Sequence, residues 1–350
     1  MRLFNLDLAA LALLTGVIPM GAAAAESAQD YPERPIKLVS GAPPGAEGAM
    51  LAHLIAEHMG QDLGQRLIVE HKPGAAHNIA GEAVARSKPD GYTLHIGGRP
   101  NTIHKVMYPS IEYDYARDLA PVGVIGTMTP ILVAGMHTPI HSVQDLVKIA
   151  KERPGELTCA STGVATTAHL LCEILKEVWD IDLTHIPYRG SAAAITDMIG
   201  GQTDVQITVV ASTLPYIKTG KLRPLATFGS ARLPTLPDVP TLRELGVPVQ
   251  DYRIWTALLV PTGTPPQIIE RLNQSLNTAL NNPKMVETML QNGMDPATAP
   301  NSPAELKNLI ASETELWTGI LRKHGIGQAD AGGGREGPAD QTGTGGNRAN

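Results

Sequence analysis

The sequence is poor in cysteine and aromatic residues and has no excess of positive charge. Its 350 residues include two cysteines, which are too few for a disulfide scaffold or a zinc ribbon. Aromatic residues make up 4%, and the 28 basic residues are outnumbered by 34 acidic ones. A protein that follows nucleic-acid phosphates needs a basic stripe, and base stacking needs aromatic side chains. We therefore expect no nucleic-acid partner.

The common catalytic and metal-binding motifs are absent as well. The chain contains no G-x-x-x-x-G-K-[ST], no G-x-S-x-G, no H-E-x-x-H and no C-x-x-C. Its 11 histidines are scattered, and the pair His137 and His141 has no carboxylate or thiol at the spacing of a metal ligand. We interpret the histidines as packing or surface residues and expect no metal and no cofactor.

The two cysteines leave two alternatives open. Cys159 ends a predicted strand, and Cys172 lies on the predicted helix that follows. Both have the character of small buried hydrophobic residues. In an oxidising compartment they could also form a disulfide.

The two ends of the chain differ in composition from the middle. Residues 1–25 combine Arg2, an apolar stretch from Leu8 to Ile18 and the run Ala23-Ala24-Ala25, which is the pattern of a cleaved secretion signal. A membrane anchor is disfavoured because the stretch is rich in alanine, barely long enough and not followed by a basic stop. Residues 331–350 contain no large apolar side chain, so we expect a disordered tail.

Between the two ends, short apolar stretches alternate with amphipathic helical patterns, which predicts an α/β protein with parallel sheets. The expected strands are Ile36–Ser40, Arg66–Glu70, Tyr92–Ile96, Val122–Gly126, Ile131–Gly135, Leu157–Ser161, Leu183–Pro187, Asp204–Val210, Leu222–Thr227 and Trp255–Pro261. The expected helices in the second half include Ser142–Glu152, Thr166–Trp179, Ser191–Gly200 and Ser212–Thr219. Near the end, Pro265-Pro266 and the capping box Ser302–Glu305 each predict the start of a further helix.

Two segments rich in small and hydroxyl residues each connect a predicted strand to the next predicted helix. They are residues 41–48 (GAPPGAEG) and residues 161–167 (STGVATT). In parallel sheets, such loops lie at the carboxyl ends of strands, where α/β folds bind ligands. Free N–H groups at the helix N-termini and Ser or Thr hydroxyls suit a carboxylate. Each loop alone could be an ordinary turn, but one loop in each half of the chain favours a shared binding cleft.

Longer motifs carry a family resemblance. They include YPERPIKLVSGAPPGAEG, HSVQDLVKIAKERPGELTCASTGVATTAHL, THIPYRGSAAAITDMIGGQTDV and WTALLVPTGTPPQIIERLNQSLNTAL. From Tyr31 to Gly327 the sequence resembles the Bug-type, TctC-like solute receptors, which are the periplasmic substrate-binding proteins of tripartite tricarboxylate transporters. The motifs occur in the order and at the spacing of that family.

The resemblance implies an α/β periplasmic binding protein of type II, a Venus flytrap whose two lobes close over one small ligand. Each lobe would be a mainly parallel sheet flanked by helices. Residues 31–127 and 255–327 would form lobe 1, and residues 128–254 would form lobe 2. The strands Val122–Gly126 and Trp255–Val260 would cross between the lobes as the hinge.

The implied function is that of a periplasmic receptor without enzymatic activity. It would bind a small mono- or dicarboxylate, aromatic acids included, and deliver it as a monomer to the membrane permease subunits of a tripartite transporter. A ligand-sensing receptor for a membrane sensor kinase would share this fold and site. A secreted hydrolase with Ser161 or Thr166 as nucleophile is a more distant alternative, because no His and acid pair is evident near these loops.

The resemblance also implies the ligand-binding residues. From the two loops these are Gly41, Ala42, Gly45, Ala46, Ser161, Thr162, Gly163 and Thr166. Arg189 could pair with a ligand carboxylate or form a structural salt bridge. Asn101 and Thr102 are candidates for the wall of the cleft, as is Thr208.

Several positions depart from the family pattern. The common PPGG-x-x-D has Ala46 and Ala49 here, and the usual PGAGGN is PGAAHN, which introduces His77. Thr208 stands where the family usually has Asp, whereas Asp204 is kept. With two carboxylates missing near the cleft, a plain carboxylate is favoured over a ligand that carries an ammonium group.

Overall fold

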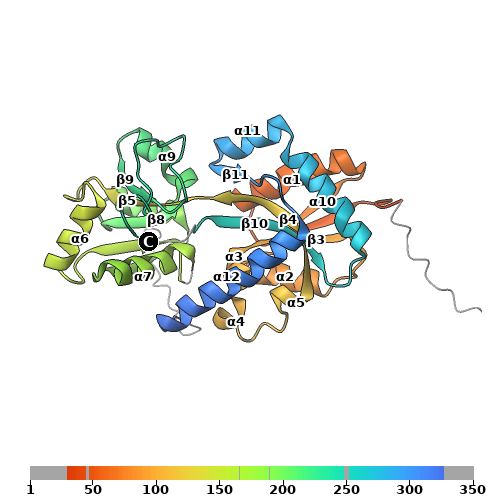
Figure 1. Cartoon of the computed structure of the whole chain (residues 1–350), viewed down its shortest axis with the longest axis horizontal. Coiled ribbons are helices and arrows are strands. Elements are labelled where there is room, and N and C mark those ends of the chain that lie inside the picture. The colour runs from red at the N-terminus through yellow and green to blue at the C-terminus, as the bar shows by residue number, and fades with distance from the viewer. Residues whose placement is uncertain (1–29, 45–46, 165, 189, 248–251, 327–350) are drawn as a thin grey trace, which may run out of the picture. The chain divides into compact units, whose positions relative to one another are not determined.

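Strands and helices alternate along the chain and build two β-sheets flanked by helices (Figure 1). The computed structural model describes residues 30–44, 47–164, 166–188, 190–247 and 252–326. The secretion signal predicted at residues 1–25 and the tail predicted at residues 331–350 lie outside the described residues. The α/β class and the two-lobed fold predicted from the sequence are confirmed.

The first sheet has the strand order β11-β4-β10-β3-β1-β2. Strand β1 is parallel to β2 and β3, whereas β10 is antiparallel to β3 and β4, and β11 is antiparallel to β4. Its strands are β1 (Ile36–Ser40), β2 (Leu67–His71), β3 (Thr93–Gly98), β4 (Leu119–Met128), β10 (Ile254–Pro261) and β11 (Met294–Pro296). Its helices are α1 (Glu47–Leu63), η1 (Ala75–His77), α2 (Asn78–Ala85), α3 (Arg99–Thr102), α4 (His104–Met107), α5 (Tyr115–Asp118), α10 (Pro266–Leu280), α11 (Pro283–Gln291) and α12 (Pro303–Lys323).

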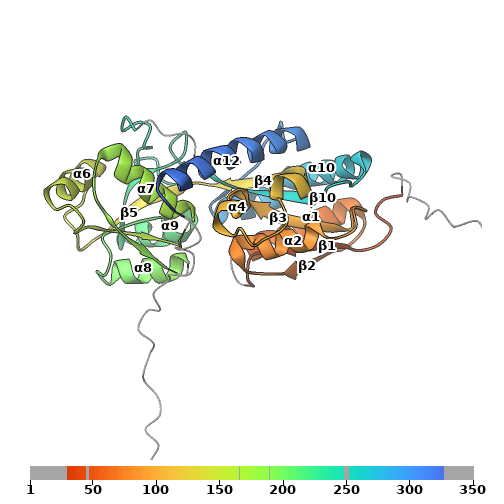
Figure 2. The same ribbon diagram turned by 90° about the horizontal axis from the view of Figure 1, so that it is seen from below.

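The second sheet has the strand order β7-β6-β8-β5-β9. Strand β6 is parallel to β7 and β8, whereas β5 is antiparallel to β8 and β9. Its strands are β5 (Pro130–Gly135), β6 (Thr158–Ser161), β7 (Thr184–Pro187), β8 (Val205–Val209) and β9 (Leu222–Thr227). Its helices are α6 (Val143–Glu152), α7 (Thr167–Trp179), α8 (Ser191–Ile199) and α9 (Val210–Lys218), and Figure 2 shows α7 and α8 on its two sides.

Both sheets are mixed, but most strands of each run in one direction, as the sequence predicted. Among the described strands, only β10 and β11 in the first sheet and β5 in the second run the other way. Strand β4 of the first sheet is separated from β5 of the second by Thr129 alone, so one extended stretch supplies both sheets. The returning strand β10 pairs antiparallel with the full length of β4, from Ile254 with Met128 to Pro261 with Leu119. The short strand β11 was not predicted, because three residues are too few to show an alternation of apolar and polar side chains. It joins the sheet by pairing with β4.

Helix α12 contributes to the hydrophobic core of both sheets. Near its start, Leu306 and Ile310 belong to the same buried cluster as Val39 of β1. Near its end, Trp317 belongs to a cluster with Leu132 of β5. The predicted capping box at its N-terminus is confirmed, since the Ser302 hydroxyl accepts from the Glu305 N–H and the Glu305 carboxylate accepts from the Ser302 N–H.

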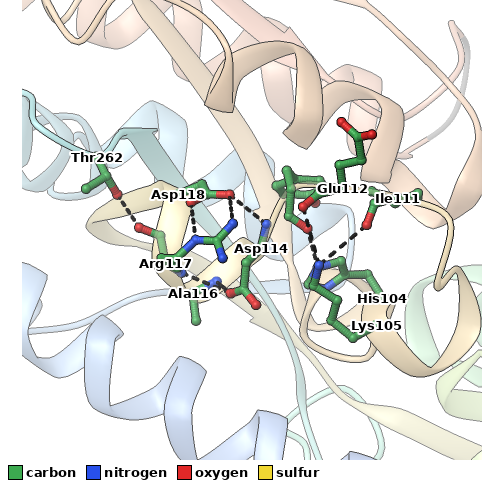
Figure 3. Close-up of polar contacts among 10 residues, drawn as sticks. His104, Lys105, Ile111, Glu112, Asp114, Ala116, Arg117, Asp118 and Thr262 are labelled. Carbon is green, nitrogen blue, oxygen red and sulfur yellow. Dashed lines mark hydrogen bonds and ion pairs between the residues drawn. The ribbon is translucent and has the colours of Figure 1, made fainter.

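A polar cluster around α5 fixes the start of β4 (Figure 3). The Asp114 carboxylate caps α5 by accepting from the N–H groups of Ala116 and Arg117, at 3.1 Å each. The Thr262 hydroxyl, just beyond β10, donates to the Arg117 carbonyl at 2.7 Å. The Arg117 guanidinium donates to Asp118 and lowers the pKa of that carboxyl to about 2. These contacts join the outer ends of the two crossing strands.

Cys159 on β6 and Cys172 on α7 form a disulfide, which is one of the two alternatives that the sequence left open. Their Cα atoms are 6.5 Å apart, and both side chains are buried. The bridge joins the strand and the helix on either side of the second predicted ligand loop.

We expect reduction of this disulfide to lower the free energy of unfolding by about 2–4 kcal/mol, because the bridge restricts the unfolded chain. Urea unfolding with and without dithiothreitol measures the change. The double variant Cys159→Ala/Cys172→Ala is the control, since its unfolding should not respond to dithiothreitol. An unchanged midpoint in the reduced wild-type protein would contradict the prediction.

Candidate functional site

A cavity of about 370 Å³ is lined by residues that belong to both sheets and their connections. This volume is in the range of sites for small organic molecules. From the first sheet and its helices the lining includes Ala76, His77, Arg99, Pro100, Ile103, Met107, Tyr108 and Ile254. From the second it includes Pro130, Thr162, Val164, Thr166, Thr167, Ala168, Gly190, Ser191, Ile207, Thr208 and Val209.

The hydroxyl-rich part of the wall lies at the N-terminus of α7. Thr166 is the N-cap: its hydroxyl donates to the Gly163 carbonyl at 2.8 Å and accepts from the His169 N–H at 3.5 Å. Thr162 and Thr167 line the cavity beside it. The N–H groups and the positive dipole end of a helix N-terminus favour an anion. Of the second predicted loop, Thr162 and Thr166 therefore reach the cavity.

Thr208 on β8 also lines the cavity, as the sequence predicted for the cleft wall. Its side chain is buried, and its hydroxyl has no hydrogen-bond partner among the described residues. A buried hydroxyl without a partner is destabilising, and a bound polar ligand would satisfy it.

Ser161 does not line the cavity. Its hydroxyl lies 2.7 Å from Nε2 of His185 and accepts from the Gly163 N–H at 3.2 Å. His185 is therefore a partner of Ser161 that the sequence did not reveal, whereas no carboxylate among the described residues bonds to His185. Burial, with the stacked His169 ring at 3.8 Å, lowers the pKa of His185 to about 3, so this imidazole is a weak base. Ser161 and Gly163 therefore stabilise the loop through the hydrogen bond between them.

None of the described residues of the first predicted loop lines the cavity, but Gly41 lies against His77, which does. Gly41 and Ala42 do not line it, and the Ala42 N–H donates to the Ser40 hydroxyl at 3.2 Å. Gly45 and Ala46 lie outside the described residues. A Cβ at Gly41 would lie 2.4 Å from the Cβ of His77, so only glycine permits this close approach. His77 itself lines the cavity.

The backbone before α2 is strained where it borders the cavity. Ala75, Ala76 and His77 have φ angles of 44°, 49° and 73°, in the left-handed region that suits glycine. The Asn78 side chain donates to the Ala75 carbonyl at 2.7 Å and supports this turn. Burial lowers the pKa of the His77 imidazole, which favours its neutral form. Such strain is concentrated at binding sites in proteins.

The remaining predicted residues have supporting positions. The Asn101 amide oxygen accepts from the Gly98 N–H at 3.0 Å, and the Thr102 hydroxyl donates to the Arg99 carbonyl at 2.8 Å. Both side chains are buried but do not line the cavity. Arg189 lies outside the described residues, although its neighbour Gly190 lines the cavity.

Arg99 is the residue of this site that the sequence analysis missed. It is the first residue of α3, lines the cavity and is 2% exposed. Its guanidinium carbon lies 4.2 Å from the centre of the Trp317 ring, and its Nε has no hydrogen-bond partner within the described part of the chain. Burial lowers the pKa of Arg99 to about 10, which still leaves it charged at neutral pH. The available signal was a lone arginine three residues after the predicted strand Tyr92–Ile96.

Two kinds of feature are absent from the described residues. In this part of the chain, His, Cys, Asp and Glu side chains form no group of three that could hold a metal ion. In the same part, no helix combines the length and apolar character needed to cross a membrane.

The sequence matches the family of tripartite tricarboxylate transporter receptors (TctC) over residues 51–326. The protein BugT of Bordetella pertussis is 35% identical over 307 residues, which cover 87% of this chain and 94% of BugT.

Solved structures agree with this match. The R. palustris protein Rpa4515 with adipate is 31% identical with a TM-score of 0.76, covering 85% of this chain and 99% of that one. MatC from Rhodopseudomonas palustris with bound malate is 26% identical with a TM-score of 0.71, covering 83% of this chain and 100% of that one.

The shifted pKa of His185 predicts a loss of stability in acid. Between pH 6.5 and about 3, the unfolded chain binds a proton at this imidazole that the folded chain does not. The free energy of unfolding should therefore fall with pH in this window, by up to about 1.4 kcal/mol per pH unit from this group. Urea unfolding from about pH 7 to about pH 4 measures the slope.

The variant His185→Gln should show a shallower slope than the wild-type protein. The exposed His141 provides the control variant His141→Gln, whose slope should match the wild type. Equal slopes in all three proteins would show that His185 titrates normally.

Proposed function

The chain belongs to the family of tripartite tricarboxylate transporter receptors, and on this premise we propose that it is a periplasmic receptor for a small carboxylate. It binds the ligand in the 370 Å³ cavity and delivers it to the membrane permease subunits of a tripartite transporter. It acts as a monomer and catalyses no reaction. Adipate in the Rpa4515 structure and malate in MatC, both carboxylates, support the ligand class.

The observation that carries this proposal is the chemistry of the cavity wall. Thr162, Thr166 and Thr167 surround the N-terminus of α7, where N–H groups and hydroxyls can bind a carboxylate. No Asp or Glu is among the described residues that line the cavity. An anion is therefore favoured over a ligand with an ammonium group, which would need a carboxylate partner.

Delivery requires that the permease distinguishes a loaded receptor from an empty one. We assign residues 31–127 and 255–327 to one lobe and residues 128–254 to the other, with β4 and β10 as the hinge. The strand junction supports this assignment, because Pro130 at the start of β5 and Ile254 at the start of β10 both line the cavity. A ligand bound there would bias the hinge toward a closed form.

The buried Ser161–His185 pair does not favour a hydrolase. Ser161 is fully buried and does not line the cavity, so a substrate in the cavity would not reach its hydroxyl. A histidine with a pKa of about 3 is also a poor general base at neutral pH.

A thermal-shift panel tests the receptor function. We expect organic acids such as adipate, malate or benzoate to raise the melting temperature, because a ligand that binds only the folded protein stabilises it. At 100 times Kd the gain is about 2.7 kcal/mol. Glucose, lysine and zinc chloride serve as controls. A panel in which only these controls shift the transition would reject a carboxylate receptor.

A second prediction concerns the unpartnered hydroxyl of Thr208. We expect Thr208→Val to weaken binding of the acid found in the panel by about 1 kcal/mol, or about fivefold in Kd, because a ligand hydrogen bond is lost. Isothermal titration calorimetry measures the change.

The matched control is Thr227→Val. Thr227 is also buried on the second sheet, at the end of β9, and its hydroxyl has no partner among the described residues, but it does not line the cavity. Its substitution should leave Kd unchanged. Equal Kd values for Thr208→Val and the wild type would remove Thr208 from the site.

A further inference from the structure

Arg99 places an unpaired positive charge in the wall of the cavity. The residue is 2% exposed, and its Nε has no hydrogen-bond partner among the described residues. None of the ion pairs between described residues involves Arg99. Glu313, the acidic residue that influences it, is engaged elsewhere, since its carboxylate accepts from the indole N–H groups of Trp255 and Trp317. A buried charge without a partner is costly, so an anion is the group that this site lacks.

The guanidinium is held in a fixed orientation. Trp317, which is fully buried on α12, stacks against it at 4.2 Å. The Thr102 hydroxyl holds the Arg99 carbonyl at 2.8 Å, which fixes the backbone beneath the side chain. Stacking covers the face of a guanidinium and leaves the N–H edge free, and this edge matches a carboxylate in a bidentate pair.

The side chains around Arg99 indicate the polarity of the rest of the ligand. Pro100, Ile103 and Met107 follow it along the chain and line the same cavity, as do Ile207 and Ile254. Arg99 is also the one Arg, Lys, Asp or Glu among the described lining residues. A ligand body in contact with these apolar side chains buries apolar surface, whereas a polar group placed against them would lose its hydrogen bonds to water.

We propose that Arg99 binds the carboxylate of the ligand, and that the ligand is an organic acid with an apolar body, either aromatic or branched aliphatic. The inference rests on the proposed receptor function and adds to it the anchoring residue and the class of acid. Amino acids and polyhydroxylated acids are disfavoured as ligands.

The test compares acids with their neutral amides. The probes are benzoate with benzamide and 4-methylpentanoate with 4-methylpentanamide, together with malate, and calorimetry measures Kd for each. We expect the wild-type protein to bind at least one of the two apolar acids about tenfold or more tightly than its amide. We also expect this acid to bind more tightly than malate.

Variants then assign the preference to Arg99. In Arg99→Met, the affinity for the acid should fall about tenfold or more and the preference over the amide should disappear. Arg99→Lys keeps the charge but loses the planar fork, so its affinity should be intermediate. Arg271→Met is the matched control: Arg271 is half-buried, pairs with Asp62 at 2.7 Å and does not line the cavity, so its loss should leave Kd unchanged.

Each part of the proposal fails on a different result. If no acid, including malate and adipate, binds the wild-type protein, the receptor function itself is rejected. If acids bind and both Arg99 variants bind them as tightly as the wild type, Arg99 is not the anchor and the receptor function stands. Tighter binding of malate than of both apolar acids would overturn the ligand class. Should neither variant fold, equal binding of acid and amide by the wild type would overturn the anchor.

Discussion

The antiparallel pairing of β4 with β10 is the interaction on which both sheets depend. Strand β4 lies between β11 and β10 in the first sheet and continues through Thr129 into β5 of the second, and β10 pairs with its whole length. At one end of the pair, the Thr262–Arg117 hydrogen bond joins the end of β10 to the start of β4. At the other end, Pro130 and Ile254 line the cavity. The same pairing therefore holds the fold together and brings the cavity walls to one place.

The cavity is built from groups that the fold leaves unsatisfied. The guanidinium of Arg99 and the hydroxyl of Thr208 are buried without full hydrogen bonding, and the turn at Ala76 and His77 is held in a left-handed conformation. Each of these features costs stability. All three features border the same cavity, and a ligand that bonds to Arg99 and Thr208 would recover part of that cost.

Local pattern predicted much of this arrangement. Thr166 caps α7 as the strand–loop–helix pattern implied, and its hydroxyl-rich segment reaches the cavity. Ser161 from the same segment does not, because side chains alternate along a strand. It shares the face of β6 with Cys159, whose disulfide runs to α7, and so it points toward His185. The local pattern thus predicted a hydroxyl-rich loop before α7, but it did not predict the direction of each side chain.

The sequence by itself determined the α/β class, the positions of most strands and helices, and the small polar loop before α7, because these follow from periodicity and capping within a few residues. Only the tertiary structure decided the mixed strand directions, the Cys159–Cys172 bridge and the place of Arg99. The guanidinium stacks on Trp317, which lies on the last described helix, far along the chain. Contacts between residues far apart in the sequence depend on how the whole core packs, so a local sequence pattern does not predict them.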